Sequence, residues 1–489
     1  MGVSFSQIPV LIREPGFYAE FDSSQAGSRA SVFPRKALLI SQRLATGTVA
    51  ELQPVRVLSA AEGEGFFGVG SQLAAMISAY KAADPQTELW AVALDDAGGA
   101  TKGTQTLTFT GPATASGAVS LYVAGTRYSL AVSIGATAEE VATACAAAIE
   151  ADSRCPMNAA VGEGESDHIV TLTAKNAGTQ GNTVDVRFNM GSSEGFPAGV
   201  GCTVAVGVTG ATDPDVNNAI AVIDESRYST IATSLNDATS VAALELALED
   251  RWAPTVKLDG LLVVALAGSL GTVTSYANAR NSPYSIVVPL QGSPSASWEV
   301  AAAVAALINA KPNVAQPHRG LVIRGMVAPA PADRWTWTER NIALTDGLSS
   351  VIATADGKVA ISRLITTYQS TAAGVADTSY LDVTTLEILS YLRYDLDVRF
   401  SLKFSDFNLA ADGAHFSAGL KILTPSGIKA ETIAWLFEKE NAGLVFGTEE
   451  IKDEIIAEID ESDANRVNLQ FGPCLMKALH VVAAKIMFR

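Results

Sequence analysis

The most enzyme-like feature of this 489-residue chain is a glycine-rich stretch between residues 63 and 68. Gly63-Glu-Gly-Phe-Phe-Gly68 matches the G-x-G-x-x-G pattern, in which glycines let the backbone approach a pyrophosphate at the start of a helix. Asp95 and Asp96 end the following strand, where an acidic residue could bind a ribose. However, Glu62 and Glu64 would place negative charge where the pyrophosphate should lie. A nucleotide-dependent enzyme is one hypothesis, and a glycine-rich lead-in to a helix is the interpretation that the charges favour.

The sequence contains side chains that often act in catalysis, but not in the motifs or pairs in which they usually act. The sequence contains no G-x-x-x-x-G-K-[ST], G-x-S-x-G or H-E-x-x-H motif, and no carboxylates are paired in a context that sets a general acid against a base. The histidines are scattered singly, and the cysteines have neither metal-ligand nor C-x-x-C spacing, so we expect reduced, mostly buried thiols. These residues are His168, His318, His415, His480, Cys145, Cys155, Cys202 and Cys474. The sequence therefore predicts no enzyme, no cofactor and no metal site.

Two tryptophans and an arginine follow a stretch from residue 310 to 336 that is rich in proline and alanine. Trp335, Trp337 and Arg340 could stack on a ligand. The composition favours another interpretation, in which these side chains pack under the crossover that the stretch forms.

Composition and charge narrow the class further. The chain has 48% hydrophobic and 17% charged residues, which is typical of packed domains, and it is long enough for two to four of them. Its net charge of −17 disfavours general binding to nucleic acid or anionic lipid. No apolar run is long enough for a membrane helix, and the first residues lack the pattern of a signal peptide. We therefore expect a cytoplasmic protein without direct membrane insertion.

The elements between residues 213 and 310 repeat in a strand-then-helix order. Apolar runs without polar alternation are typical of strands covered on both faces, and they are separated by segments with helical spacing. The expected strands are Ser229–Ala232, Leu261–Ala267, Ser285–Pro289 and Gly320–Arg324, joined by Lys36–Ser41, Pro54–Leu58 and Leu89–Leu94, with helices at Ser71–Ala83 and Trp298–Asn309. A doubly wound α/β layer is the predicted core.

A segment of different composition interrupts this core. Residues 98–210 are rich in glycine and threonine and alternate like short strands, and Ala124-Gly125 supplies a hairpin turn. Thr137 and Glu140 form the pattern of a capping box at the start of a helix. We interpret the segment as an inserted β-rich domain, which could be a binding module or a spacer.

The remaining boundaries follow from composition. We predict an N-terminal arm at 1–35, a discontinuous core at 36–97 and 211–330, a C-terminal α+β domain at 331–475 and a strand arm at 476–489. In the α+β domain a helix is expected from Thr448 to Asp460, with a strongly acidic outer face that is usually a solvated surface. The fold class is thus α/β and α+β multidomain, with a central α/β sheet core, an inserted β-rich domain and extended terminal strand arms.

Both ends of the chain have strand character and no obvious partner in the sequence. Gly16–Phe21 alternates between apolar and other side chains, and Leu479–Phe488 is an apolar run in a basic terminus without carboxylates. A lone strand must pair elsewhere. The N-terminal one could fold back onto its own domain, or it could add to a sheet of a neighbouring copy.

Short blocks in the second half have the order and spacing of one protein family. They are Glu339-Arg-Asn341, Ile361-Ser-Arg-Leu-Ile-Thr-Thr-Tyr368, Asp377-Thr-Ser-Tyr-Leu-Asp-Val-Thr-Thr385 and Tyr391-Leu-Arg393. Together they resemble the block shared by tail sheath subunits of contractile bacteriophages, in the Mu-like branch. Pro15-Gly-Phe-Tyr18 and Phe67-Gly-Val-Gly-Ser71 resemble two further sheath features. Phe17 stands where many sheaths have Val, and both residues suit a strand.

This resemblance implies a structural subunit rather than an enzyme. It implies hexameric rings stacked around a tail tube, contraction that drives the tube through the host envelope, and tail tube, baseplate and tail terminator proteins as partners. The expected location is the virion tail, after assembly in the host cytoplasm. The alternatives are the nucleotide-dependent enzyme and a non-sheath tube or baseplate component.

The strand character of the two ends supplies the predicted subunit interface. Its residues are Pro15, Gly16, Phe17, Tyr18, Ala19, Phe21, Leu479, Val481, Ala483, Lys485 and Met487. In this hypothesis Pro15 and Gly16 form a hinge. The basic residues Arg466, Lys477 and Arg489 are expected to contact the tube or a neighbouring subunit.

Overall fold

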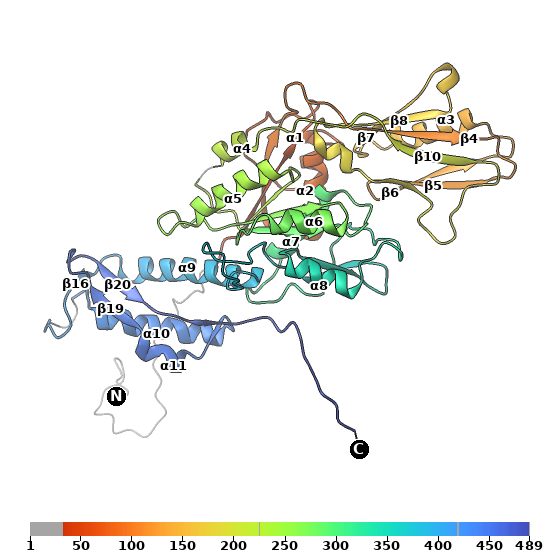
Figure 1. The fold of residues 1–489 in the computed structure, drawn as a ribbon. Helices are drawn as coiled ribbons and strands as arrows, with labels where there is room; N and C mark the ends of the chain where they lie inside the picture. Colours follow the sequence, from red (N-terminus) through yellow and green to blue (C-terminus); the bar gives the residue numbers. More distant parts are fainter. Residues whose placement is uncertain (1–32, 224, 418–419, 489) are drawn as a thin grey trace, which may run out of the picture.

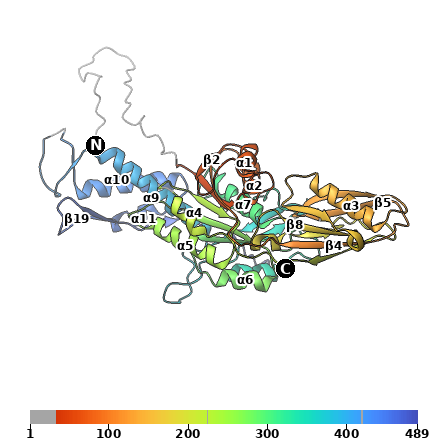
Figure 2. The ribbon, with the colours of Figure 1, turned by 90° about the horizontal axis from the view of Figure 1, so that it is seen from above.

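The computed structural model describes residues 33–223, 225–417 and 420–488. Three parts follow one another along an elongated molecule (Figures 1 and 2). A central α/β part lies in the middle, an inserted unit formed by residues 104–206 lies at one end, and a C-terminal unit formed by residues 383–475 lies at the other. The predicted class, a mixed α/β multidomain protein with several sheets, is confirmed.

The central part is built on a six-stranded sheet with strand order β13-β12-β11-β1-β3-β2. All neighbouring pairs are parallel except β2 with β3. The strands are β1 (Lys36–Gln42), β2 (Val55–Val57), β3 (Glu88–Leu94), β11 (Thr230–Thr233), β12 (Leu261–Leu266) and β13 (Ser285–Pro289). Almost every side chain of β1, β11, β12 and β13 is buried, as their unbroken apolar sequences predict.

Helices cover both faces of this sheet. Leu39 and Val263 share a core with α2 and α7, whereas the alternate residues Leu38 and Leu262 share another with α4, α5 and α6. The helices are α1 (Ala60–Phe67), α2 (Gln72–Ala83), α4 (Val216–Val222), α5 (Ala238–Trp252), α6 (Leu270–Asn278) and α7 (Ser297–Asn309).

The strand predicted at Gly320–Arg324 is wrong. Only Val322 forms an isolated bridge, with Ala360. Gly320 and Gly325 adopt φ values of 82° and 84°, so the backbone turns at both ends of the run.

The nucleotide-binding loop considered for residues 63–68 is also wrong, because most of the stretch lies inside α1. Ser59 caps this helix by accepting a hydrogen bond from the Glu62 amide, and the Glu62 carboxylate accepts one from the Leu58 amide. A Cβ at Gly63 would stand 2.7 Å from Ile77 Cγ2, which shows that this glycine permits close packing of α1 on α2. Helix packing therefore explains the glycine without a phosphate.

The inserted unit packs two sheets and one helix. One sheet has the order β10-β4-β8-β7, and the other has the order β6-β5-β9. Ala124 and Gly125 form the β5–β6 turn with positive φ angles, and the predicted capping box of Thr137 and Glu140 begins α3. The elements are β4 (Thr104–Thr110), β5 (Gly117–Val123), β6 (Thr126–Val132), α3 (Ala138–Glu150), β7 (Met157–Val161), β8 (Ile169–Ala174), β9 (Val186–Phe188) and β10 (Gly201–Val206), with 3₁₀ turns η1 (Gly164–Ser166) and η2 (Thr179–Thr183).

The chain beyond residue 336 contains longer helices than the sequence suggested. Its elements are α8 (Trp337–Thr345), β14 (Ser350–Ala353), β15 (Val359–Arg363), α9 (Val383–Phe404), β16 (Asn408–Leu409), β17 (Ile422–Leu423), α10 (Pro425–Asn441), β18 (Val445–Phe446), α11 (Thr448–Ile451), η3 (Lys452–Glu454), β19 (Ile456–Ile459), β20 (Val467–Gln470) and β21 (Cys474–Leu475). The helix predicted from Thr448 to Asp460 is wrong after Ile451. There the β-branched residues Ile456 and Ile459 pair with β20 as a strand.

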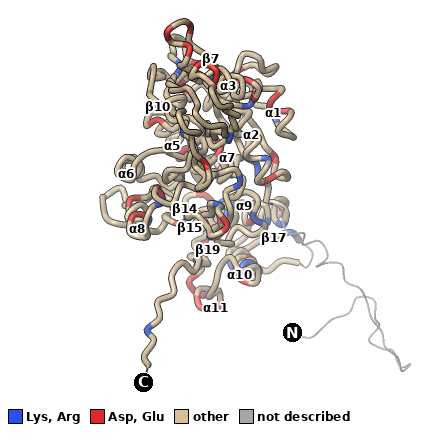
Figure 3. Tube along the Cα trace, turned by 90° about the vertical axis from the view of Figure 1, so that its right-hand side faces the viewer, with Lys and Arg blue, Asp and Glu red and all other residues tan. Residues whose placement is uncertain are grey.

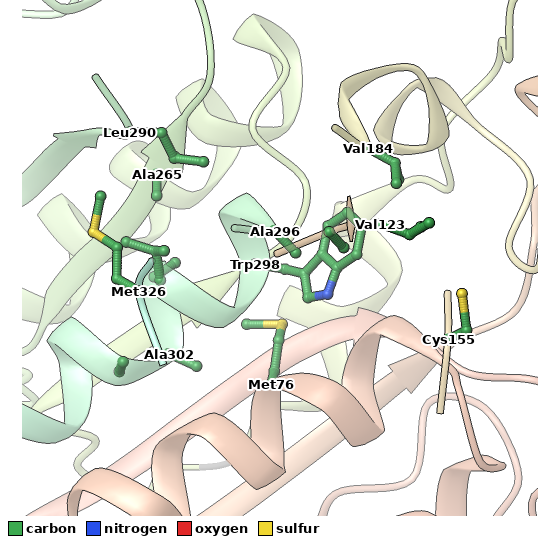
Figure 4. Close-up of a cluster of buried hydrophobic side chains, with 14 of the residues drawn as sticks. Met76, Val123, Cys155, Val184, Ala265, Leu290, Ala296, Trp298, Ala302 and Met326 are labelled. Atoms are coloured by element: carbon green, nitrogen blue, oxygen red, sulfur yellow. The ribbon is translucent and has the colours of Figure 1, made fainter. Parts of the chain in front are cut away.

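One buried aromatic side chain joins the central part to the inserted unit. Trp298 of α7 is 2% exposed and belongs to a core that extends from the central sheet into the inserted unit. Figure 4 shows it near Met76 of α2, with Val123 and Val184 of the inserted unit close by. The two parts therefore share one apolar core.

Candidate assembly interface

Half of the predicted interface cannot be placed. Pro15, Gly16, Phe17, Tyr18, Ala19, Phe21 and Arg489 lie outside the described residues. Their role in assembly stays a prediction.

The C-terminal segment, residues 476–488, leaves the body of the protein as an extended chain (Figures 1 and 3). Among the described residues it pairs with no strand, so the predicted strand 479–488 has no partner in that part of the chain. Most of its apolar side chains are uncovered: Leu479, Val481, Val482, Ile486, Met487 and Phe488 are 73–95% exposed. The segment also contains exposed Ala483 and Lys485. Apolar side chains displayed in this way indicate a partner surface.

The contacts that the segment makes with described residues lie at its beginning. The Met476 amide donates to the Leu444 carbonyl at 3.0 Å, and the His480 carbonyl accepts from Arg319 at 3.2 Å. His480 Nε2 lies 3.3 Å from the Asp382 carboxylate, and Arg363 donates to the same carboxylate at 3.0 and 3.2 Å. Burial lowers the pKa of His480. These contacts fix where the chain leaves the C-terminal unit.

Two of the basic residues predicted to contact a tube, Arg466 and Lys477, lie at separate places in the C-terminal part of the chain. Arg466 follows the turn between β19 and β20, and its guanidinium donates to Asn468. Lys477 is exposed just after β21. Their contacts with another molecule stay a prediction.

A buried ionic cluster joins the central part to α9. Glu387 of α9 accepts from Lys311 Nζ at 2.9 Å, and His318 Nε2 lies 3.2 Å from the same oxygen. Burial lowers the pKa of Lys311 and of His318, whereas the two basic neighbours hold the pKa of Glu387 below its ordinary value against the effect of burial. His318 is thus not isolated, contrary to the sequence prediction.

A second polar cluster joins α9 to the strand edge beside it. Asp259, which is 2% exposed, accepts from Arg393 at 2.7 Å and from Ser390 at 2.9 Å. Arg227 donates to Ser390 at 2.6 Å and lies over the ring of Phe33. Burial raises the pKa of Asp259 and lowers that of Arg227 to about 10. Neutralising Arg393 would leave the Asp259 carboxylate buried without its ion-pair partner.

On its other side α9 is tied to α10. Asp395 accepts from the Trp435 indole at 2.7 Å and pairs with Lys439 at 2.6 Å. Trp435 is fully buried in the core of the C-terminal unit. The helix α9 therefore connects the central sheet to the unit that carries the C-terminal segment.

The place where an α/β enzyme would bind its ligand is occupied by protein. In open α/β sheets that place is outside the carboxyl ends of the strands, where the strand order reverses. Here the reversal falls at β1 and β11, and the crevice loop, residues 176–182 of the inserted unit, lies over it. Gln42 at the end of β1 donates to the Ala177 carbonyl at 2.8 Å, and Gln180 donates to Asn236 beyond β11 at 3.0 Å.

Asp96 secures this crevice loop from the end of β3. Its carboxylate accepts from Gln42 at 2.7 Å, from Asn176 at 3.2 Å and from the Ala177 amide at 2.9 Å. Asp96, considered as a ribose ligand, thus binds backbone and amide groups of the protein itself. The carboxylate of Asp95 pairs with Arg43 instead.

Metal-binding groups, cysteines and membrane-spanning helices were the remaining features to locate in the described part of the chain. Within it, no three His, Cys, Asp or Glu side chains are grouped so that they could hold a metal ion. All four cysteines are free; Cys145 and Cys155 are buried, but Cys474 is exposed, which corrects the expectation for that thiol. None of the helices in the described ranges has the length and apolar character that crossing a bilayer requires.

A terminal segment whose apolar side chains no described residue covers indicates a protein that assembles with others. Comparison with known families agrees, because residues 209–367 match the phage tail sheath protein central domain and residues 375–489 match the phage tail sheath C-terminal domain. The chain is 34% identical, over its full length and that of the relative, to the Mu-like prophage FluMu tail sheath protein of Haemophilus influenzae. The chain therefore belongs to the contractile phage tail sheath family, in its Mu-like branch.

A solved sheath structure shares the fold at much lower identity. The sheath tail protein Lin1278 of Listeria innocua has a TM-score of 0.50 and 13% identity, covering 93% of this chain and 94% of that one. The sheath tail protein of Desulfitobacterium hafniense has a TM-score of 0.49 and 14% identity, covering 94% and 100%.

Proposed function

We propose that this sheath protein polymerises as stacked hexameric rings around a tail tube and contracts to drive the tube through a host envelope. In this proposal the protein is not an enzyme, and its partners are further copies of itself, the tail tube, the baseplate and the tail terminator. It assembles in the host cytoplasm and remains in the virion tail. The observation that carries the proposal is the C-terminal segment, whose apolar side chains are not covered by any described residue.

The terminal arms link neighbours by adding strands to their sheets. Main-chain hydrogen bonds of an added strand do not depend on rigid contact between the bodies, so subunits could rotate past one another and stay connected. The two-stranded sheet β19–β20 has two unpaired edges in the described chain, and Ile456 on it is 50% exposed. Such edges are suited to accept a strand.

Each proposed domain has its own role in this assembly. Residues 36–97 and 211–330 form a rigid core, 98–210 a peripheral unit, 331–475 the unit that meets neighbours, and 1–35 and 476–489 the arms. Arg466, Lys477 and Arg489 contact acidic surface on the tube or an adjacent subunit.

Deletion of the arms tests this function. Negative-stain microscopy should show ribbed tubes for the full chain, whereas deletion of residues 1–21 or of 479–489 should leave a folded monomer without tubes. Circular dichroism of each truncation checks that the core remains folded. Normal tubes from both truncations would disprove the arm mechanism, and a dispersed full-length particle that binds NAD would instead support the enzyme.

A further inference from the structure

A pocket of about 250 Å³ lies beyond the carboxyl end of β13, beside the β14–β15 hairpin. Its lining comes from the segment after β13, from residues 326–340 and from the hairpin. The residues that matter for its chemistry are Gln291, Arg334, Trp335 and Arg340. We call this site the arginine pocket.

Trp337, expected to pack under the crossover, is 73% exposed at the first residue of α8, so that expectation is wrong.

Gln291 presents a donor that the described protein leaves without an acceptor. Its side chain is 5% exposed, and its Nε2 forms no hydrogen bond with any described residue. Its φ of 52° is unusual for a residue other than glycine. A buried donor without a partner is costly, and this one belongs to a residue that lines the pocket.

The two arginines add positive charge that no carboxylate neutralises within the described chain. Arg334 Nε donates to the Pro329 carbonyl at 3.0 Å, and Arg340 Nη1 donates to the Trp335 carbonyl at 2.5 Å. These bonds orient both guanidinium groups and leave further N–H groups free. Of the acidic residues next to the two arginines in sequence, Asp333 pairs with Arg187, and the Glu339 carboxylate accepts hydrogen bonds from Thr336. The pocket thus offers donors and positive charge, which suit a carboxylate.

The same chain carries a matching group far from this pocket. The acidic segment, residues 448–463, contains Glu450, Glu454 and Glu458, which are exposed and form no ion pair with described residues. Acidic positions crowd α11 in Figure 3, and Figure 1 places α11 and β19 in a different part of the molecule from α8. Contact between the pocket and the segment therefore requires two copies.

We propose that the arginine pocket of one copy binds a carboxylate side chain from the acidic segment of a second copy. Two different surfaces would then meet, and such heterologous contacts generate rings or helical polymers. The exposed side chain of Trp337 lies near these arginines in sequence, and tryptophan and arginine are enriched among the residues that contribute most to binding at interfaces. The proposal rests on the polymerisation proposed above and identifies one contact within it.

Charge exchange tests the contact. The double variant Arg334→Glu/Arg340→Glu should raise the protein concentration needed for tube formation at least tenfold, measured by sedimentation and negative-stain microscopy. Adding Glu450→Lys, Glu454→Lys and Glu458→Lys to that variant should restore most of the loss. The neutral pair Arg334→Gln/Arg340→Gln should show a smaller loss, and circular dichroism identifies any variant that fails to fold. Lys358→Glu is the control, because Lys358 is exposed and, among the described residues, its ion pair is with Asp356.

Each contrary result has a distinct meaning. Wild-type protein that forms no tubes would refute the proposed function itself. Tubes at the normal concentration from both arginine variants would overturn the contact, and so would a loss that the lysine substitutions do not reverse. Titration of inorganic phosphate into the monomer is a further experiment. A saturable change in tryptophan fluorescence that the glutamine pair abolishes, with normal tube formation by that pair, would make the pocket a site for small anions and overturn the proposal.

Discussion

Lys311 Nζ and Glu387 Oε2 lie 2.9 Å apart in a place where their side chains are only 3% and 9% exposed. Because Lys311 follows α7 and Glu387 belongs to α9, this buried pair joins the central part to the C-terminal unit. The sequence gives no sign of it, since the partners are 76 positions apart.

Removing one partner should be much more damaging than removing both. Lys311→Met would leave Glu387 buried with one basic neighbour fewer, and we expect a loss of about 3–5 kcal/mol in the free energy of unfolding. The double variant Lys311→Met/Glu387→Leu should be closer to the wild type at neutral pH, because both members of the pair are removed and burial favours the neutral form of His318. Denaturant titration followed by tryptophan fluorescence measures both. Equal stability of the two variants would show that the ion pair is not what holds this contact.

Acid should weaken the same contact through His318. Burial lowers the pKa of this histidine in the folded protein below 6.5, so the unfolded chain binds the proton more readily. Stability should therefore fall as the pH drops below about 6.5, and fall further below about 4.5 because the pKa of Glu387 is also lowered. His318→Gln should flatten the change between pH 7 and 5 in denaturation experiments. An unchanged slope in that variant would assign the effect to other groups.

The crevice loop should depend on one of two adjacent carboxylates. Asp96 accepts three hydrogen bonds, two from residues 176–177 and one from Gln42 at the end of β1, whereas Asp95 pairs with Arg43 and has a side chain 45% exposed. Asp96→Ala should cost about 2–4 kcal/mol of stability, because the donors would be left without an acceptor.

Hydrogen exchange gives the sharper measurement for this loop. Asp96→Ala should speed exchange of the amides in residues 176–182, and Asp95→Ala, the matched control, should cost about 1 kcal/mol or less without that change. Equal effects of the two substitutions on loop exchange would contradict the role given to Asp96.

The strands of the central sheet could be predicted because burial on both faces leaves a local signature. Leu261–Leu266 is an unbroken apolar run and becomes the fully covered strand β12. The capping box of Thr137 and Glu140 was equally local, since both hydrogen bonds join residues three positions apart. Signals of this kind need no knowledge of the rest of the fold.

What escaped prediction depends on residues far apart in sequence. His318 looked isolated because its partner Glu387 lies on a helix that begins 65 residues later. The acidic stretch after Ile451 had helical spacing, but pairing of β19 with β20 determines its structure. The apolar sequence of residues 479–488 predicts a strand that needs a partner, but it does not indicate the anchor at Asp382.

The glycines of α1 give a direct test of whether this stretch is a packed helix or a phosphate-binding loop. A Cβ at Gly63 would meet Ile77 at 2.7 Å, whereas a Cβ at Gly65 has nothing within 4 Å. Gly63→Ala should therefore destabilise the protein by about 1–3 kcal/mol through overpacking. Gly65→Ala should stabilise it by about 0.5–1 kcal/mol, because alanine loses less backbone freedom in a helix. Thermal unfolding of the two variants measures the contrast, and a dinucleotide such as NAD should shift neither transition. If both alanines were equally harmful, or if NAD raised the melting temperature of the wild type, the helical interpretation of residues 63–68 would fail.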